Sequence, residues 1–366
     1  MSEPLENRMM ARALELAESA AGRTSPNPLV GAVVVKDGRA VGEGCHRRAG
    51  APHAEIVALR QAGKKARGAA LFVNLEPCCH HGRTPPCVDA IIASGISRVV
   101  VAMRDPNPLV RGRGINALRR AGIEVGVGLM RERARRLNEI FIHHITAGTP
   151  FAALKLAQTL DGAIAAAPGV RTPITSSAAL RLTHRLRSSY DAVLVGISTV
   201  LADDPMLNVR GVRNAKQPLR VVLDSCLNTP LDSRLAATAE RFPTLVLYDP
   251  ACSAKQRMDA LARKGIGLAP VEKASGGILP PPEALKTLAA LGITSVLIEG
   301  GKRVATSFLK QETIQRLHLF IAPLLMGEGE PLHCPGELGE LGNRLRLRDL
   351  ERRFLGPDIY LTARLD

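Results

Sequence analysis

Apolar, β-branched runs of strand length alternate with segments of helical periodicity along almost the whole chain. In the first part, strands are expected at 29–35, 40–44, 70–75, 98–103 and 125–127, and helices at 5–21, 52–62, 88–94, 113–121 and 131–144. Strands separated by helices of these lengths are typical of layered folds in which helices cover a sheet. The alternation therefore predicts the α/β fold class.

A run of small residues, Thr146-Ala-Gly-Thr-Pro150, interrupts this alternation. At about 150 residues per domain, the chain length is enough for two domains, and we place them at 1–147 and 148–366. In the second domain, strands are expected at 151–157, 192–196, 219–224, 244–248, 295–299 and 317–322, and helices at 177–188, 256–264, 282–291 and 304–310. The halves share no self-similarity, which predicts two different domains.

The chain is strongly basic, with a formal net charge of +15. Such a balance favours anionic partners, including nucleic acids, acidic membranes and phosphorylated small molecules. Aromatic residues make up only 3% and Trp is absent, whereas proteins that bind single-stranded nucleic acid use aromatic faces on which bases stack. No segment resembles a secretory signal or has the length of a membrane helix. We therefore expect a cytoplasmic protein with no membrane partner.

Three of the seven cysteines fall within ten positions, beside two histidines. This cluster, Pro77-Cys78-Cys79-His80-His81-Gly-Arg83-Thr-Pro-Pro-Cys87, follows the earlier motif Pro52-His53-Ala54-Glu55. One imidazole and two thiolates suit a tetrahedral zinc site with its fourth position open to water. We expect the ligands at helix N-termini, where the helix dipole favours thiolates.

Glu55 follows His53 by two positions, about 200° around an ideal helix, and is badly placed as a co-ligand. A carboxylate beside a zinc site can take a proton from water, whose pKa zinc lowers to about 7, and deliver it to a leaving amine. His-x-Glu followed by Pro-Cys is the signature of zinc nucleobase deaminases. Two alternatives remain open at this point: a closed, non-catalytic zinc site that includes His80 or His81, and cysteines that are simply buried.

Five motifs resemble the deaminase domain of the bifunctional riboflavin-biosynthesis deaminase/reductase family. They are Pro26-Asn27-Pro-Leu-Val-Gly-Ala-Val33, Gly44-Cys-His46, Pro52–Glu55, Pro77–Cys87 and Asp105-Pro-Asn107-Pro108. The signature expects Pro-Cys-x-x-Cys, whereas eight residues separate Cys78 from Cys87 here, and this longer spacing is typical of the family. The resemblance implies a cytidine-deaminase-like three-layer α/β/α domain, with one Zn²⁺ on His53, Cys78 and Cys87 and with Glu55 as the catalytic proton shuttle.

The same resemblance implies substrate contacts in the deaminase domain at Asn27, His46, Arg83, Asp105 and Asn107. Asn and Asp suit the amino and carbonyl edges of a pyrimidine ring, while Arg83 and His46 suit a phosphate. Each of the two loops also has a plainer interpretation, because Asn27 between prolines and Asp105-Pro-Asn-Pro are typical of turns.

The second domain carries weaker signals of its own. Ser295-Val-Leu-Ile-Glu299-Gly300-Gly301 predicts a strand that enters a Gly-Gly turn before a helix, a geometry that can approach a phosphate. No G-x-G-x-x-G motif follows a strand, so an ordinary dinucleotide fold is not supported. Lys155 lies within an apolar strand, either as a buried cation with a role or as an edge-strand residue that faces solvent.

Motifs at 154–162, 174–176, 196–205 and 298–301 resemble the reductase domain of the same family, which is dihydrofolate-reductase-like and uses NADPH. Many members have Trp before the Ile-Thr-Ser motif, where this chain has Pro173. The resemblance implies cofactor contacts at Ala157, Thr199, Asp203, Ser225, Gly300 and Gly301. It implies contacts to the substrate's ribose phosphate at Lys155, Arg187, Leu207, Arg210 and Glu299.

The family implies two successive reactions on small ribose-phosphate pyrimidines: zinc-dependent deamination of a diaminopyrimidinone, then NADPH-dependent reduction of the ribosyl to a ribityl chain. We also expect a homo-oligomer. The rival class is a nucleic-acid deaminase or RNA-binding protein, supported by eight Arg within Arg111–Arg136. Such a charge run is more commonly a solvated helix face. With the aromatic content so low, we expect no nucleic-acid partner.

Overall fold

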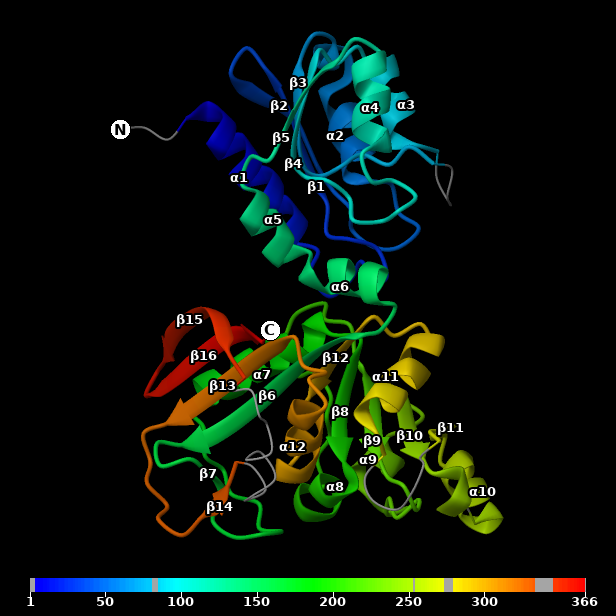
Figure 1. Ribbon diagram of the computed structural model, residues 1–366, viewed down its shortest axis with the longest axis vertical. Helices are drawn as coiled ribbons and strands as arrows, with labels where there is room; N and C mark the ends of the chain where they lie inside the picture. The colour runs from blue at the N-terminus through cyan, green and yellow to red at the C-terminus, as the bar shows by residue number, and fades with distance from the viewer. Residues whose placement is uncertain (1–3, 81–84, 253, 273–278, 333–344, 366) are drawn as a thin grey trace. The chain divides into compact units, whose positions relative to one another are not determined.

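The computed structural model describes residues 4–80, 85–252, 254–272, 279–332 and 345–365 (Figure 1). The chain divides into two compact units, residues 1–148 and 149–366. Each unit is built around its own sheet and is described by itself. Across the described residues, no helix combines the length and the apolar character needed to cross a bilayer.

A five-stranded sheet with strand order β2-β1-β3-β4-β5 forms the centre of the first unit. β1 is antiparallel to β2 and β3, whereas β3, β4 and β5 are parallel. The strands are β1 (Gly31–Lys36), β2 (Arg39–Cys45), β3 (Ala70–Leu75), β4 (Arg98–Met103) and β5 (Glu124–Val127). The helices are α1 (Leu5–Glu18), α2 (Ala54–Ala62), α3 (Cys87–Ala93), α4 (Arg113–Arg120), α5 (Arg131–Leu137) and α6 (Glu139–Ala147), with a short 3₁₀ turn at Gly63–Ala66.

Helices cover both faces of this sheet, because alternate strand residues point to opposite sides. In β1, Ala32 and Val34 pack with residues of α2, α3 and α4, whereas Val33 and Val35 pack with α1 and α5 (Figure 1). The first unit is thus a three-layer α/β/α sandwich.

The segment 131–144, expected as one helix, is two helices, and the prediction was wrong at Asn138. Asn138 has φ −105° and ψ 18°, outside helical geometry. Its side chain accepts a hydrogen bond from the Leu29 amide at 2.8 Å and donates to the Leu29 carbonyl at 3.0 Å. A long-range backbone contact therefore accompanies the break, and sequence periodicity carries no sign of such a contact.

The second unit contains a nine-stranded sheet with strand order β11-β10-β9-β8-β12-β6-β13-β16-β15. It is parallel from β11 to β13, and β16 and β15 add two antiparallel strands at one edge. The strands are β6 (Phe151–Thr159), β8 (Ala192–Gly196), β9 (Leu219–Leu223), β10 (Thr244–Tyr248), β11 (Gly267–Pro270), β12 (Ser295–Ile298), β13 (Arg316–Ala322), β15 (Leu347–Leu355) and β16 (Asp358–Leu365). β7 (Ala163–Ala165) and β14 (Glu330–Pro331) form a separate pair.

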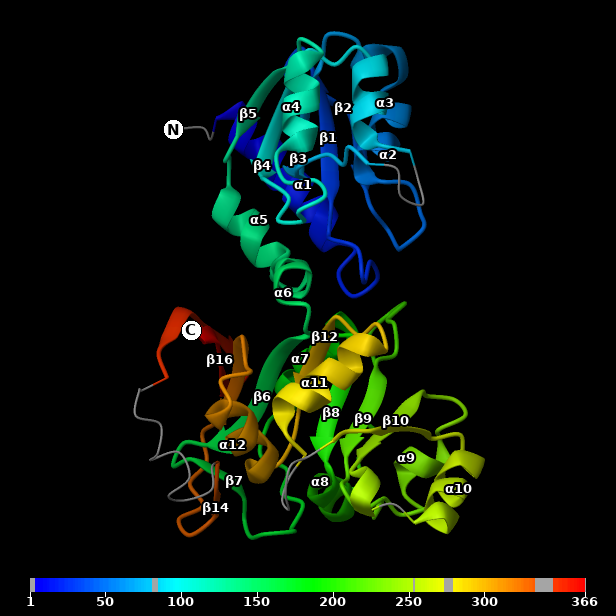
Figure 2. The same cartoon turned by 45° about the vertical axis from the view of Figure 1, so that its right-hand side comes forward.

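Helices lie on both faces of the larger sheet (Figure 2). The helices are α7 (Ser177–Ser189), α8 (Ile197–Asp203), α9 (Arg234–Ala237), α10 (Lys255–Arg263), α11 (Pro281–Ala290) and α12 (Lys302–Lys310), with a 3₁₀ turn at Pro250–Cys252. α11 and α12 pack on the central strands in one apolar cluster. α7 packs against Phe320 and Tyr360 in another.

Lys155 lies on β6, which is flanked by β12 and β13 in the interior of the sheet. The interpretation of Lys155 as a solvent-facing residue on an edge strand was therefore wrong. Its ammonium lies 5.5 Å from the centre of the Phe320 ring. A cation is thus placed inside the fold, beside the larger cavity described below.

Candidate active sites

His53, Cys78 and Cys87 converge at one end of the first unit. His53 caps the N-terminus of α2, and Cys87 is the first residue of α3. Cys78 lies instead in the connection between β3 and α3, so the prediction of a helix N-terminus was wrong for this residue. His53 Nδ1 lies 3.0 Å from Cys87 Sγ and 3.5 Å from Cys78 Sγ. All three ligand atoms lie within 4.8 Å of one another.

The chemistry of this donor set fits a zinc ion. A hydrogen bond from Cys87 lowers the pKa of Cys78 to about 4, and the same contact raises the pKa of Cys87. Two neighbouring thiols can both ionise only when a cation lies among them, and one imidazole with two thiolates is a common zinc set. In the part of the chain that the structure describes, His80 does not join this group. His81 falls outside the described residues, and the alternative of a closed, non-catalytic zinc site that includes His81 stays a prediction.

Glu55 lies in the first turn of α2 and is 3% exposed. Burial raises the pKa of its carboxyl to about 7. Oε2 is buried and has no hydrogen-bond partner among the described residues. An unpaired buried carboxylate oxygen is costly unless a ligand or water meets it. Glu55 therefore presents a free proton acceptor beside the three ligand atoms.

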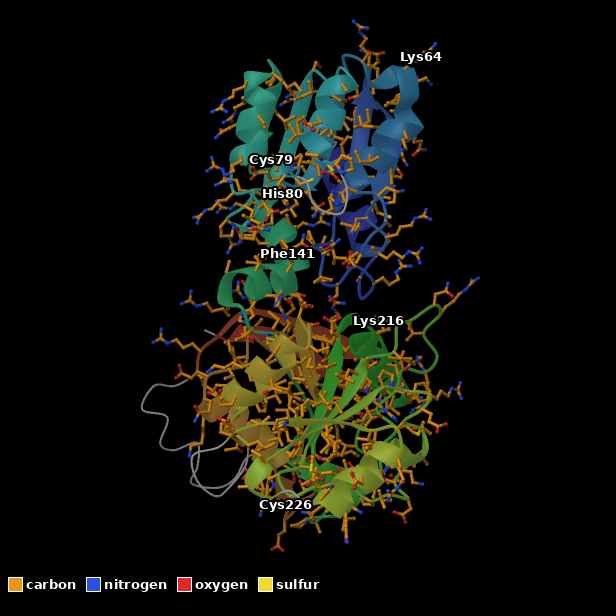
Figure 3. All side chains as sticks on the ribbon, turned by 90° about the vertical axis from the view of Figure 1, so that its right-hand side faces the viewer. Lys64, Cys79, His80, Phe141, Lys216 and Cys226 are labelled. Carbon is orange, nitrogen blue, oxygen red and sulfur yellow. The ribbon has the colours of Figure 1, made fainter. Side chains whose placement is uncertain are left out.

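A cavity of about 380 Å³ opens over this cluster. The expected residues that line it are Asn27, His46, His53, Glu55, Cys78, Asp105 and Asn107. Cys87 is fully buried below it, and Arg83 lies outside the described residues. Phe141 of α6 and His80, both labelled in Figure 3, also line the cavity. Phe141 carries no motif that sequence reasoning could have used.

The side chains of the two cavity loops are held by hydrogen bonds. Asn27 Nδ2 lies 3.0 Å from His46 Nε2, and His46 Nδ1 lies 3.2 Å from the Pro52 carbonyl, which can only accept. Nδ1 therefore carries the proton and Nε2 accepts, while burial lowers the pKa of His46. Asp105 accepts from the Asn107 amide at 2.8 Å, and burial raises the pKa of Asp105 to about 6. This loop is therefore both a turn, as one interpretation had it, and part of the cavity wall, as the other had it.

A second cavity, of about 510 Å³, lies in the second unit. The expected residues that line it are Lys155, Ala157, Arg187, Thr199, Asp203, Leu207, Arg210, Glu299, Gly300 and Gly301. Ser225 does not line it. The ends of the parallel strands β8 and β12 border this cavity, as is usual for ligand sites in such sheets.

An ion pair lies at the inner wall of this cavity. Arg187 Nε and Nη2 donate to the two oxygens of Glu299 at 2.6 and 2.9 Å. The charge of Arg187 and its hydrogen bonds lower the pKa of Glu299 despite the opposing effect of burial. Burial lowers the pKa of the nearby Lys155. The site therefore holds Glu299 as a carboxylate, with Lys155 beside it as a cation that can release a proton more easily than usual.

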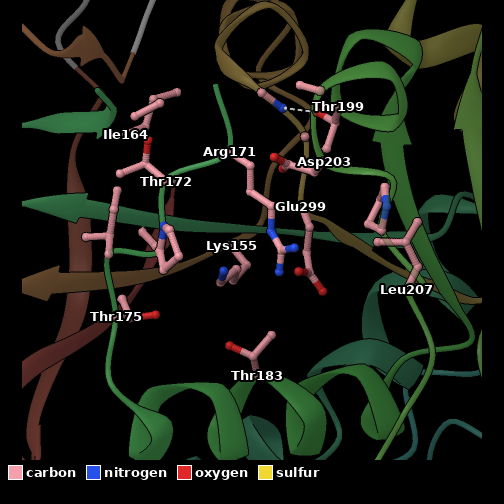
Figure 4. Close-up of a pocket in the computed structure, with 18 of the residues that line it drawn as sticks. Lys155, Ile164, Arg171, Thr172, Thr175, Thr183, Thr199, Asp203, Leu207 and Glu299 are labelled. Atoms are coloured by element: carbon pink, nitrogen blue, oxygen red, sulfur yellow. Dashed lines mark hydrogen bonds between the residues drawn. The ribbon is translucent and has the colours of Figure 1, made fainter. Parts of the chain in front are cut away.

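The Gly300-Gly301 turn meets α8 at close range. The Gly301 amide donates to Thr199 Oγ1 at 3.1 Å (Figure 4). A Cβ at Gly300 would lie 2.7 Å from Val304 Cβ, so only glycine fits this approach to α12. The turn leads into the N-terminus of α12, and the first N–H groups of a helix can meet a phosphate.

Two arginines that the sequence analysis did not name also line the second cavity. Arg171 reaches between Asp203 and Glu299 towards the centre (Figure 4). Arg234 begins α9, and its amide donates to Asp204 at 2.7 Å. Its charge contributes to lowering the pKa of Arg210, after burial and Arg187. No motif surrounds either residue, because only the folded loops bring them to the cavity.

Comparisons with known proteins match one family model to each unit. The RibD C-terminal domain family matches residues 150–361, and the cytidine and deoxycytidylate deaminase zinc-binding region matches residues 4–103. The expected deaminase-like first domain and reductase second domain are thereby confirmed. The second domain is a reductase domain, whose chemistry calls for a nicotinamide cofactor.

Similar proteins span the whole chain. The riboflavin biosynthesis protein RibD of Aquifex aeolicus is 47% identical over 99% of both chains, and that of Escherichia coli is 41% identical over 96% of this chain and 97% of the other. RibD of Acinetobacter baumannii superposes with a TM-score of 0.87 at 37% identity, covering 99% of both chains. A deaminase/reductase of Thermotoga maritima gives 0.84 at 36% identity, again with 99% coverage of both. The chain therefore belongs to the RibD family of riboflavin-biosynthesis proteins.

Proposed function

We propose that this chain is a bifunctional enzyme of riboflavin biosynthesis. The first unit hydrolyses an amino group from 2,5-diamino-6-ribosylamino-4(3H)-pyrimidinone 5′-phosphate. The second unit then reduces the ribosyl group of 5-amino-6-(5-phosphoribosylamino)uracil to the ribityl chain. The observation that carries the proposal is the buried carboxylate of Glu55 beside the cluster His53, Cys78 and Cys87, within one cavity.

In the deaminase site, His53, Cys78 and Cys87 would hold one zinc ion. A bound zinc ion lowers the pKa of water to about 7. Glu55 accepts the proton of the attacking water on Oε2 and returns it to the amine that leaves as ammonia. Asn27, Asp105 and Asn107 line the same cavity and orient the pyrimidine edge, while the walls of the cavity limit the access of water.

In the reductase site, the cofactor is NADPH, which supplies the hydride. The Gly300-Gly301 turn, Thr199 and Asp203 hold it, together with Ala157. Ser225 has the same assignment by family resemblance, although it does not line the cavity. Glu299 and Lys155 would face the ribose. Conversion to the ribityl chain breaks the C1′–O4′ bond of the ring, so that O4′ needs a proton and C1′ a hydride; the buried ammonium of Lys155 would donate that proton, and bound NADPH would supply the hydride.

The remaining residues of the reductase set bind the ribose phosphate. Arg187 holds Glu299 in place, Arg210 meets the phosphate and Leu207 borders the same wall. In the first unit, Arg83 and His46 are assigned by family resemblance to the phosphate end of the substrate. Burial lowers the pKa of His46, and its N–H is engaged by the Pro52 carbonyl, so Arg83 is the charged group of this pair.

We further assign the enzyme to the cytoplasm and expect a homo-oligomer. The edge strand β15 supports the second point: among the described residues it pairs with β16 alone, and two apolar side chains on this otherwise mostly charged strand, Leu350 and Phe354, are 60% and 74% exposed. Exposed apolar side chains beside an unpaired strand edge can be covered by another chain. The excess positive charge serves to attract phosphorylated small molecules, because both cavities have the size of small-ligand sites.

A coupled assay tests the proposal. Purified protein with zinc and NADPH is given the diaminopyrimidinone ribose phosphate, and ammonia release and loss of the NADPH absorbance band are followed. Glu55→Gln is expected to abolish ammonia release while the variant still reduces substrate that has already been deaminated. Arg210→Ala is expected to raise the KM of the reductase alone. Absence of both signals in the wild type would overturn the proposed function.

A further inference from the structure

Asn74, near the end of β3, is followed at alternate positions by two further polar residues, Glu76 and Cys78, which lie in the connection to α3. Asn74 and Glu76 are 0% and 3% exposed. Cys78 belongs to the metal cluster, but neither of the other two has a role in the reaction described above. Buried polar groups of this kind need partners, and the partners show what they do.

Glu76 binds four backbone amides, two with each oxygen. Oε2 accepts from Asp105 at 3.2 Å and from Gly112 at 2.9 Å. Oε1 accepts from Gly114 at 3.0 Å and from Ile115 at 3.2 Å. These four bonds use the lone-pair capacity of a carboxylate in full, and the N-terminus of α4 adds a favourable dipole.

These bonds fasten one wall of the deaminase cavity to β3. The segment that Glu76 holds, 105–115, includes Asp105 and Asn107, both of which line the cavity. The attachment is close, since a Cβ at Gly114 would lie 2.1 Å from the Pro77 carbonyl oxygen. Glu76 itself also lines the cavity, while its carboxylate oxygens are engaged by these amides.

Asn74 fastens the opposite loop. Its Oδ1 accepts from the Gly31 amide at 2.8 Å, and its Nδ2 donates to the Leu29 carbonyl at 2.8 Å. Asn138 binds Leu29 from the other side. Asn27 precedes Leu29 by two positions in the same loop. Asn27 lines the cavity and contacts His46.

We infer that Asn74 and Glu76 are positioning residues, each of which sets one substrate-binding loop of the deaminase relative to Cys78, which follows them closely along the chain. Asn74 acts through Asn27, and Glu76 acts through Asp105. This inference rests on the proposed deaminase function. A merely structural role would spread over both loops, whereas these contacts divide the two loops between the two residues.

Double-mutant cycles on the deaminase KM test this division. Glu76→Gln replaces one acceptor oxygen with an NH₂ group that faces two amides, and it is expected to raise KM on the order of tenfold. Combined with Asp105→Asn, it is expected to raise KM no further than the larger single effect. Combined with Asn27→Ala, the two effects are expected to multiply. For Asn74→Ala the expectation is reversed. Combined with Asn27→Ala, it is expected to raise KM no further than the larger single effect, whereas combined with Asp105→Asn the two effects are expected to multiply.

Controls separate positioning from loss of stability. Val99→Ala, a buried core change on β4 of the same unit and outside both loop segments in the sequence, is expected to lower the melting temperature without changing KM. All variants are expected to keep one zinc per chain and unchanged reductase kinetics. Effects that multiply in all four pairings, or a KM equal to that of the wild type in Glu76→Gln, would overturn the inference.

Amide exchange provides a reading that is independent of activity. In Glu76→Asp, which shortens the side chain while keeping its charge, exchange is expected to rise at Asp105, Gly112, Gly114 and Ile115 but not at Gly31. In Asn74→Ala, the rise is expected at Gly31 alone. A wild type that releases no ammonia would refute the proposed function, whereas equal exchange changes in both loops would refute the positioning roles. The exchange measurement on Glu76→Asp and Asn74→Ala also tests the positioning roles if Glu76→Gln does not fold.

Discussion

His318, buried in the second unit, is expected to make that unit sensitive to mild acid. The imidazole is 5% exposed and lies between Tyr190 and Tyr360, with Nε2 3.0 Å from the Tyr190 hydroxyl and Nδ1 2.7 Å from the Tyr360 hydroxyl. Burial, with a smaller effect of the Arg316 charge, lowers the pKa of His318 from 6.5 to about 3. The folded protein therefore keeps this side chain neutral.

The sign and size of the effect follow from proton linkage. Between pH 6.5 and about 3, the unfolded chain binds a proton at His318 that the folded chain does not, so the free energy of unfolding falls as the pH falls through this window. At about pH 5 this one group lowers the free energy of unfolding by about 2 kcal/mol relative to about pH 8. His318→Gln keeps a donor and an acceptor for the two hydroxyls and has no charge to gain.

Urea unfolding followed by tyrosine fluorescence measures the difference. Trp is absent, and the three Tyr, at 190, 248 and 360, all belong to the second unit, so the signal reports that unit alone. The wild type is expected to lose about 2 kcal/mol more than His318→Gln between about pH 8 and about pH 5. Every other titrating group is common to both proteins. Parallel loss in the two, within about 0.5 kcal/mol, would refute the assignment of His318 as a buried neutral imidazole.

Three further predictions concern other parts of the chain. Zinc removal by a chelator is expected to lower the melting temperature of the first unit and not of the second, in calorimetry, and a shift in both transitions would contradict a zinc site confined to the first unit. Arg220→Met removes the arginine donor from the carbonyls of Met206, Leu235 and Phe242, of which Phe242 keeps a bond from Thr244 Oγ1, and is expected to lower the free energy of unfolding of the second unit by about 3 kcal/mol; a loss below about 1 kcal/mol in urea titration would show that these bonds matter little. Arg234→Met is expected to raise the reductase KM on the order of tenfold for the phosphorylated substrate and not for its dephosphorylated form; equal effects on both would rule out a phosphate contact.

Local sequence determined much of the fold because strands and helices with clear apolar periods form wherever a core is available. The bounds of β3, β4, β8 and β10 agree with the expected ranges residue for residue. Shorter elements escaped notice, among them α8 and α9, which follow β8 and precede β10 without a distinct apolar period. β15 was missed because its residues are mostly charged and exposed, so that backbone pairing with β16 alone makes it a strand.

The candidate site divides in the same way. Motifs pointed to His53, Glu55, Cys78 and Cys87 because zinc chemistry demands particular donor atoms at particular spacings, and these residues meet in the structure. The structure left Ser225 outside the cavity it was expected to line.

Only the tertiary structure decided which side chains support the site. Glu76 stands beside Pro77 and Cys78 in the sequence, yet its four partners lie 29 to 39 positions away. Arg234 likewise lines the second cavity only because the fold brings it beside Asp204, to which its amide donates a hydrogen bond. Motifs record the atoms that do chemistry, whereas positioning depends on hydrogen bonds to backbone amides, which every residue except proline carries and which leave no pattern in the sequence. The sequence was therefore sufficient to predict the reactive groups of this protein, whereas the contacts that hold these groups in place were decided by the tertiary structure.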